Sequence, residues 1–215
     1  MKHSRMRVYF DYNATSPPAP DVCDAVAAAT VDLFGNPSSV HYYGQQAKAA
    51  LDRARGELAS LLRAEPSELV FTSGGTEADN FAIRGVCEAL EQSPRRHLVA
   101  SAIEHEAVLN TLKALARRGW RVSLVPVDQT GIVSVDRIQD AVTDDTALVS
   151  VMHANNEIGT IQPIPEAAAV AHACGALFHT DAVQSVGKLD VHPASLGVDL
   201  LSLSAHKFNG PKGAG

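Results

Sequence analysis

A lysine follows an apolar run close to the last residue of the 215-residue sequence. The run LLSLS (200–204) is typical of a buried strand, and Lys207 comes after it in the segment AHKFNGPKG. An amine at the end of a buried strand is partly desolvated, which disfavours the ammonium form and lowers the pKa. A neutral amine is a nucleophile whose typical task is to form an imine with a carbonyl compound. A single lysine at such a position is more often a solvated surface residue, so Lys207 alone does not establish this chemistry.

A glycine pair follows another apolar run. The run ELVFT (68–72) leads into SGGTEADN (73–80), in which Gly74 and Gly75 permit close approach of the backbone and Thr76 adds a hydroxyl. Free N–H groups at a helix N-terminus, together with the helix dipole, bind phosphate groups. The segment matches neither the P-loop nor the dinucleotide-binding pattern. Its simpler explanation is a glycine turn closed by a Ser or Thr cap.

Polar side chains follow three further apolar runs. Asp181 follows ALFHT, with Gln184 close behind it, and the carboxylate could cap a short helix or point at a ligand nitrogen. His105 follows HLVASAI, and the segment HANNEIGT (153–160) follows TALVSVM. A capping histidine and turn-forming asparagines are the simpler explanations of these two features.

The elements that must position these groups alternate along the chain from residue 66 onward. Continuous apolar strands separated by helices predict an α/β fold with a mostly parallel sheet covered by helices on both faces. The predicted strands are 68–72, 97–103, 121–127, 146–152, 176–180 and 200–204. The predicted helices are about 18–33, 41–62, 77–91, 106–118, 134–142 and 165–175.

The second predicted helix carries an apolar stripe. Its alanines and leucines recur at spacings of three and four, which predicts that this face packs on the sheet. The stripe consists of Ala47, Leu51, Ala54, Leu58, Leu61 and Leu62.

In an open parallel sheet, ligands bind beyond the carboxyl ends of the strands. The sequence places a phosphate cradle, a carboxylate, a histidine that could stack on a ring and an amine nucleophile at that edge. These are the groups that pyridoxal 5′-phosphate requires, because its phosphate, ring nitrogen and aldehyde each need one of them. The combination therefore predicts a pyridoxal-phosphate site.

Composition and charge argue against several other classes of function. The chain is 46% hydrophobic and 20% charged, as in an ordinary globular domain, and its net charge of −6 disfavours nucleic acid as the main partner. No run approaches the roughly 18 apolar residues of a membrane span, and the N-terminal segment lacks an apolar signal core. We therefore expect a cytoplasmic protein with no membrane partner.

The three cysteines do not suggest a disulfide framework or a metal site. Cys23, Cys87 and Cys174 are widely separated and form no CxxC pair. Each lies in a helical stretch rich in Ala and Val, which predicts a small buried thiol.

Seven motifs stand out along the chain, and five of them carry the groups described above. They are YFDYNATSPP, FGNPSS, VFTSGGTEADN, EHEAVLN, MHANNEIGTIQPI, HTDAVQSVGK and LSAHKFNGPKGAG. In order and spacing they resemble the cysteine desulfurases of fold type I, within the class-V aminotransferases. The resemblance runs from about residue 8 to the last residue. It is closest to the branch that supplies sulfur for iron–sulfur clusters and tRNA thiolation.

The resemblance implies a role for each matching residue around the cofactor ring. Lys207 would carry the cofactor as an imine and later move the substrate proton. Asp181 would pair with the pyridine nitrogen, while Gln184 and Asn156 would bond the phenolic oxygen. His105 would stack on the ring and serve as an acid or base.

The resemblance also implies which residues hold the phosphate. Gly75 and Thr76 at the helix start, with Ser204 and His206 near the lysine, would form this part of the site. Gly75 departs from the family pattern, where alanine is common, and should loosen the phosphate loop slightly without removing a donor.

For the whole enzyme, the resemblance implies conversion of L-cysteine to L-alanine with the sulfur left as a persulfide on a cysteine. It further implies a homodimer and a sulfur-acceptor protein, either an iron–sulfur scaffold or a tRNA-thiolation relay. Residues 1–17 would form an arm that joins a small domain, and 18–215 would form a large domain that is incomplete at its C-terminal end. The nucleophilic cysteine of the family lies beyond the lysine, and none of the three cysteines here matches it.

Two alternatives stay open at this point. The chain could be a catalytically inactive fragment or partner subunit that binds the cofactor. It could also belong to a related pyridoxal-phosphate enzyme, such as a selenocysteine lyase or another lyase or aminotransferase.

Overall fold

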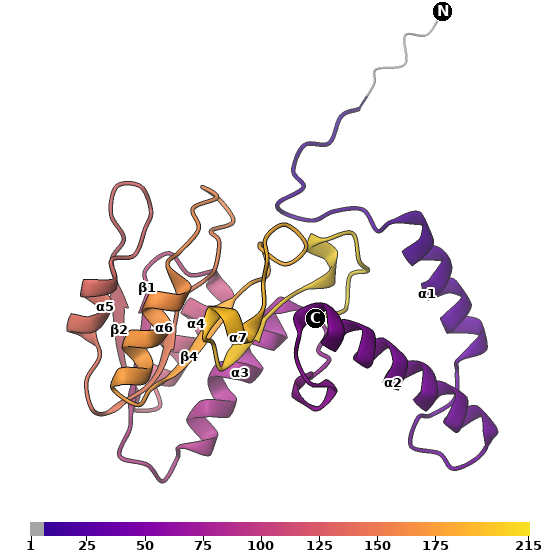
Figure 1. Cartoon of the computed structure of the whole chain (residues 1–215), viewed down its shortest axis with the longest axis horizontal. Coiled ribbons are helices and arrows are strands. Elements are labelled where there is room, and N and C mark those ends of the chain that lie inside the picture. Colours follow the sequence, from indigo (N-terminus) through magenta and orange to yellow (C-terminus); the bar gives the residue numbers. More distant parts are fainter. Residues whose placement is uncertain (1–6) are drawn as a thin grey trace, which may run out of the picture.

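The computed structural model describes residues 7–215, so the first residues of the predicted arm lie outside the described part. Its centre is a strand sheet that lies among helices (Figure 1). The sheet has five strands in the order β2-β1-β3-β4-β5, and every pairing is parallel. The predicted α/β fold with a mostly parallel sheet is confirmed. The strands are β1 (His97–Ser101), β2 (Arg121–Val125), β3 (Thr146–Ser150), β4 (Leu177–Asp181) and β5 (Leu200–Ser202).

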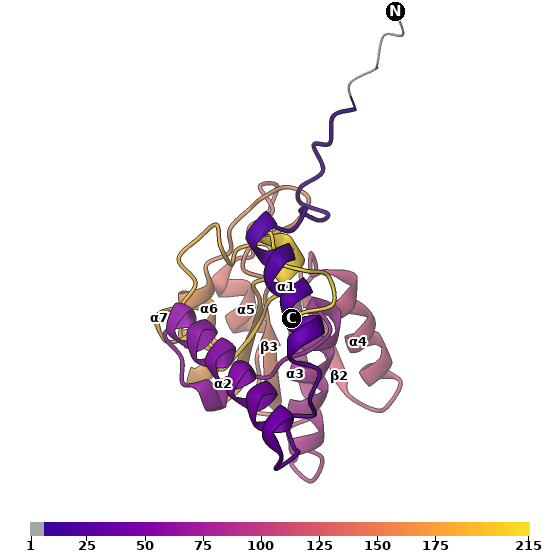
Figure 2. The same cartoon turned by 90° about the vertical axis from the view of Figure 1, so that its right-hand side faces the viewer.

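Helices cover both faces of the sheet, and Figure 2 shows them on either side of β3. One face carries α3 (Gly75–Ala89) and α4 (Glu106–Ala116). The other carries α5 (Val135–Ala141), α6 (Ile164–Ala173) and the short α7 (Pro193–Leu196). No helix within residues 7–215 has both the length and the apolar character needed to cross a membrane.

The apolar runs of the central strands follow from this double cover. In β1, Leu98 and Ala100 pack with α3 and α4, whereas Val99 packs with the opposite layer. All three are almost completely inaccessible to solvent. Because successive strand residues point to opposite faces and both faces are covered, apolar residues are needed at consecutive positions.

The helices α1 (Pro20–Asp32) and α2 (Tyr42–Leu62) stand to one side of the sheet (Figure 1). The prediction that the apolar stripe of α2 packs on the sheet is wrong, because Leu61 is 62% exposed and Leu51 is also exposed. The C-terminal part of α2 instead contacts the turn Pro66–Glu68. An apolar cavity of about 700 Å³, lined by Leu58, Leu62 and β5 residues among others, lies between the helix and the sheet edge.

The predicted strand 68–72 is also wrong. Its first residue ends a 3-10 turn, and the following residues belong to no sheet strand within residues 7–215. Within the described part of the chain, Thr72 is the one residue of this run that pairs with a distant backbone segment. Its N–H donates to Gly215 O at 2.8 Å, and its oxygen accepts the Gly215 N–H at 2.9 Å. Val70 and Phe71 remain exposed. A β-strand requires a neighbour along its length, and within residues 7–215 this run has one only at its last residue.

The cysteine predictions hold only in part. Cys87 on α3 is buried, and Cys174 at the end of α6 is half-buried. Cys23 is exposed, contrary to the prediction, because α1 has no buried residue.

Candidate cofactor site

The carboxyl ends of the strands surround a cavity of about 680 Å³. It collects every side chain that the sequence analysis singled out as cofactor-binding, from segments far apart in the sequence. Its walls are the start of α3, the entry to α4 and the loops after β3, β4 and β5. These lining residues are Gly75, Thr76, His105, Asn156, Asp181, Gln184, Ser204, His206 and Lys207.

Lys207 lies in a 3-10 turn, Ala205–Lys207, that follows β5. Its Nζ donates a hydrogen bond of 2.6 Å to the backbone oxygen of Asn13. Burial and then the nearby charge of Lys188 lower the pKa of Lys207, while the charges of Asp181 and Asp11 oppose this shift. A lowered pKa increases the neutral fraction of the amine, which is the nucleophilic form.

Asp181 is the last residue of β4 and is buried. Its Oδ1 accepts a hydrogen bond of 2.9 Å from the backbone N–H of Val183, so the carboxylate caps a turn, and no helix follows it. Burial raises the pKa of Asp181, opposed by this hydrogen bond and by His105 and Lys207. A buried carboxylate in this position gains stability in its charged form when a cationic N–H group faces it.

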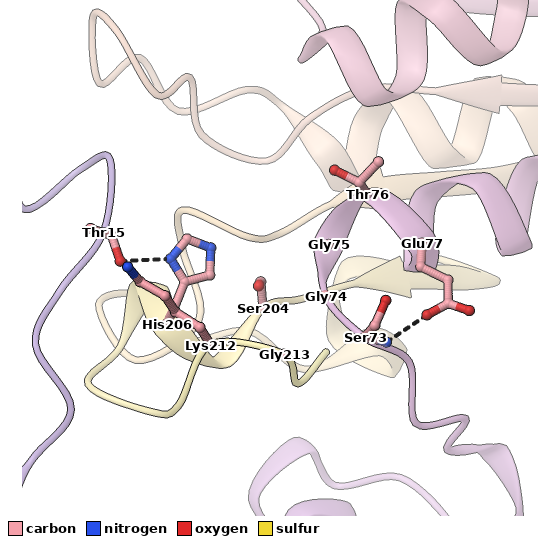
Figure 3. Close-up of a pocket in the computed structure, with 10 residues that line it drawn as sticks. All are labelled: Thr15, Ser73, Gly74, Gly75, Thr76, Glu77, Ser204, His206, Lys212 and Gly213. Atoms are coloured by element: carbon pink, nitrogen blue, oxygen red, sulfur yellow. Dashed lines mark hydrogen bonds between the residues drawn. The ribbon is translucent and has the colours of Figure 1, made fainter.

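The phosphate cradle predicted after residue 72 is the N-terminus of α3. The helix begins at Gly75, two residues earlier than predicted, and Gly74 before it has φ +149°, which favours glycine. The first amides of a helix have no carbonyl partner within it and therefore suit an anion. A second cavity of about 330 Å³ adjoins this terminus, with Ser204 and His206 on its opposite wall (Figure 3).

Gly75 packs closely against neighbouring segments of the chain. A Cβ atom built at Gly75 would lie 2.8 Å from Val183 Cγ2 and 3.5 Å from Ser204 Cβ, both on residues that line the large cavity. Alanine at this position would require Val183 to shift. The glycine therefore leaves room for the close packing of the α3 start against the loop that follows Asp181.

His105 both caps a helix and lines the cavity. Its Nδ1 accepts a hydrogen bond of 3.1 Å from the Ala107 N–H, which makes it the N-cap of α4. In the neutral ring the proton is then on Nε2. The capping explanation and the cavity location are therefore compatible.

The two asparagines of the loop after β3 have different environments. Asn155 is buried, and its Oδ1 accepts the N–H groups of Glu157 and Ile158, which shapes the loop. Asn156 lines the cavity, and its Nδ2 donates to Glu157 Oε1 at 2.7 Å. Gln184 lines the cavity from the loop after β4 and donates from Nε2 to Asn13 O at 2.9 Å.

Two buried carboxyl groups close to Asp181 were missed by the sequence analysis. Asp79 on α3 is 1% exposed and lines the cavity, and its Oδ1 has no hydrogen-bond partner among residues 7–215. Burial and then the charge of Asp181 raise the pKa of Asp79 to about 8. Burial likewise raises the pKa of Glu104 to about 8, although its Oε1 accepts hydrogen bonds from Ser101 Oγ and Met152 N.

The buried His179 on β4 lies 3.6 Å from Asp79, measured from Nε2 to Oδ1. Burial lowers the pKa of His179 to about 4. Since the pKa of Asp79 is raised to about 8, both groups are neutral between these values, and their contact is not an ion pair. The sequence offered only a weak signal for Asp79, namely its place inside the TEADN segment that follows the glycine pair.

The N-terminal segment also contributes to the cavity. Asp11, Asn13 and Ala14 line it, although the sequence analysis assigned them no part in the site. These three residues are far from Lys207 in the sequence. No local pattern could therefore have indicated that the N-terminal segment contacts Lys207.

A lysine with a lowered pKa, a buried carboxylate and a helix N-terminus around one cavity define a class of protein. They are the groups that hold pyridoxal phosphate at the carboxyl edge of a parallel sheet, and the class is that of pyridoxal-phosphate-binding α/β proteins.

Comparisons with known proteins identify the family. Residues 8–215 match the family described as Aminotransferase class-V. The cysteine desulfurase IscS of Dictyoglomus turgidum is 46% identical over 211 residues, which cover 98% of this chain and 53% of that protein. The cysteine desulfurase of Mus musculus is 44% identical over 97% of this chain and 45% of its own length. The chain thus spans about half the length of the curated relatives it matches.

Solved structures agree with this assignment. A NifS-like protein superposes with a TM-score of 0.94 at 42% identity, covering 97% of this chain and 57% of that one. A structure described as SspA in complex with cysteine gives a TM-score of 0.92 at 41% identity, with 97% and 60% covered. The chain belongs to the class-V aminotransferase family, whose cofactor is pyridoxal 5′-phosphate.

Proposed function

We propose that this chain forms the cofactor-binding part of a cysteine desulfurase. The enzyme would convert L-cysteine into L-alanine and pass the sulfur as a persulfide to a cysteine thiol. The observation that carries this proposal is the single cavity in which Lys207, Asp181 and the N-terminus of α3 meet. The relatives named cysteine desulfurase and the SspA structure with bound cysteine support this substrate.

Lys207 would link covalently to the cofactor aldehyde and later move a proton at the substrate Cα. Its lowered pKa supports both tasks, because the amine must be neutral to attack and must exchange protons near neutral pH. When bound, the cofactor supplies an electron sink for the carbanion formed at that carbon.

Asp181 would hold the pyridine nitrogen in its protonated form by accepting its N–H. The carboxylate is buried and one of its oxygens is already fixed by Val183, so its orientation toward a ring is set in advance. Gln184 and Asn156 would donate to the phenolic oxygen, and His105 would stack on the ring and act as an acid or base.

Gly75 and Thr76 would bind the phosphate with the first-turn amides of α3 and the Thr76 hydroxyl. Ser204 and His206 would contact it from the opposite wall of the smaller cavity, on which both residues lie. This arrangement would anchor the cofactor at one end while Lys207 holds the other.

The sulfur-accepting cysteine would lie in a segment outside this sequence. None of the three cysteines lines the cavity. Burial raises the pKa of the Cys87 thiol to about 12, which makes it a poor nucleophile.

The proposed partners are a second copy of the chain and a sulfur-acceptor protein, either an iron–sulfur scaffold or a tRNA-thiolation relay. Helix α1 supports the first of these, because it buries none of its residues within this chain and leaves Val26 and Val31 exposed. An exposed apolar helix face is typical of a subunit interface.

A substitution in the full-length enzyme tests the proposal. Lys207→Ala should abolish alanine formation from L-cysteine, whereas Lys113→Ala, on the exposed surface of α4, should leave it unchanged. Full activity in the Lys207 variant would refute the assignment. Alanine formed from L-selenocysteine but not from L-cysteine by the wild-type enzyme would identify the related lyase instead.

A further inference from the structure

The N-terminal segment binds the loop that carries the reactive lysine. Ser16 lies at the centre of this contact and is 7% exposed. Its backbone N–H and its hydroxyl both donate to the backbone oxygen of His206, at 2.9 and 2.8 Å. The same hydroxyl accepts the backbone N–H of Asn209 at 2.9 Å. One serine therefore bridges the residues on either side of Lys207 and Phe208.

Asn209 has a backbone conformation that requires support. Its φ is +65°, in the left-handed region that costs non-glycine residues free energy. Asn209 makes two hydrogen bonds besides the one to Ser16. Its backbone oxygen accepts the Ala19 N–H at 2.9 Å, and its side-chain Nδ2 donates to Pro17 O at 2.9 Å. Three hydrogen bonds from residues 16–19 thus hold the residue that turns the chain after the lysine.

The same segment contacts the side chains of this loop. His206 Nδ1 lies 3.0 Å from Thr15 Oγ1, a contact visible in Figure 3. The Lys207 Nζ donates to Asn13 O. Residues 13–19 therefore fix the backbone on both sides of Lys207 as well as the direction of its amine.

We propose that Ser16 is a positioning residue for Lys207. Its hydroxyl would keep Asn209 in the left-handed conformation and so fix the turn from which the lysine enters the cavity. The inference rests on the proposed role of Lys207 as the cofactor-linking residue. A misplacement of a reacting amine by about 1 Å is enough to slow a reaction strongly.

The test uses the full-length enzyme freed of cofactor. After addition of pyridoxal phosphate, the absorbance of the Lys207–cofactor link is followed in time, and hydrogen exchange of the Asn209 amide is measured without cofactor. Ser16→Ala should slow link formation and speed amide exchange, each by about tenfold, the factor expected for one hydrogen bond. Ser195→Ala is the matched control, because Ser195 also donates to a backbone oxygen but lies away from both cavities.

A second substitution separates positioning from general loosening. Glycine adopts positive φ without strain, so Ser16→Ala combined with Asn209→Gly should recover most of the lost rate. Unchanged rates in Ser16→Ala, or no recovery in the double variant, would overturn the inference. If the wild-type enzyme itself forms no link with the cofactor, the proposed function fails instead.

Discussion

The two faces of the central sheet are equally buried but are filled by different side chains. The face toward α5 and α6 is apolar at its centre, where Val99, Val149 and Phe178 lie side by side. These residues have almost no exposed surface. This face has no part in the cavity and serves the core alone.

The face toward α3 and α4 changes character along the strands. Leu148 lies in its apolar part, whereas Ser150, His179 and Ser202 follow toward the carboxyl ends. His179 Nδ1 lies 2.9 Å from Ser150 Oγ and its Nε2 lies 3.0 Å from Ser202 Oγ, so hydrogen bonds join three strands beneath the cavity. Asp181 follows His179 on the same face.

The comparison shows how one sheet separates stability from function. Alternate residues of β4 point to opposite faces, so Phe178 can be selected for packing while His179 and Asp181 are selected for the site. Changes to the first face should reduce stability and spare the site. Changes to the second should alter the site and its protonation with little loss of stability.

Truncation of the apolar face should have the largest effect on stability. Phe178→Ala removes a fully buried ring from the centre of that face and should reduce the free energy of unfolding by about 3–5 kcal/mol. Denaturant unfolding of the full-length protein measures this change. Phe81→Ala, at an exposed position on α3, is the control and should change stability little. A comparable loss of cofactor affinity in folded Phe178→Ala would contradict the separation of the two faces.

The substitution Asp181→Asn tests the opposite case. The amide keeps the shape and can still accept the Val183 N–H, but it cannot provide the negative charge proposed to face the pyridine nitrogen. Alanine formation should fall by about 10²–10³-fold, as expected when a preorganised charge is removed. Stability should not fall, because the variant removes a buried ionisable group whose pKa is raised.

The surface variant Asp140→Asn serves as the control in the same alanine assay. A loss of stability in Asp181→Asn that matches that of Phe178→Ala, with activity retained, would show that Asp181 belongs to the core and not to the site.

The sequence predicted the strands of the sheet correctly but predicted a strand at 68–72 that the structure does not contain. Val99 and Phe178 lie in apolar runs that are paired on both sides, and each run was predicted within a few residues of its observed bounds. The run at 68–72 has a similar composition, but no strand within residues 7–215 lies beside it. Local composition predicts an extended segment, whereas pairing depends on neighbours that composition does not specify.

In the candidate site too, the local sequence indicated some residues and not others. Lys207 and Asp181 were predicted because each follows an apolar strand, and parallel strands bring such positions to one edge. Gly75 was predicted from the glycine pair that precedes a helix. Asp79, Glu104 and Ser16 were not predicted, because their roles depend on tertiary contacts between distant segments. The short helix α7 was missed although Pro193 at its start and Gly197 at its end, with φ +67°, are local signals of helix ends.

A smaller effect is expected from the buried carboxyl group beneath the site. Burial raises the pKa of Asp79 from 3.8 to about 8, so the folded protein keeps a proton that the unfolded chain loses near pH 3.8. The folded state therefore becomes less stable relative to the unfolded state as pH rises between these values. Asp79→Asn keeps a neutral group of the same shape and removes this contribution. The cofactor-free variant should match the wild type near pH 4 and should be more stable at pH 8 by about 1–3 kcal/mol.

Unfolding measured across this pH range decides the result. Other titratable groups face Asp79 or its cavity, namely Asp181 and His179 on β4, Glu104 before α4, and the cavity-lining Asp11, His105, Glu157, His206 and Lys207. Asp181 and Glu104 also have raised pKa values, so some pH dependence of the same sign should persist in the variant. Asp136→Asn, at an exposed position on α5, is the control for removal of a surface charge. A variant less stable than the wild type at pH 8 would mean that Asp79 is ionised there, and the polar face would then hold a second negative charge beside Asp181.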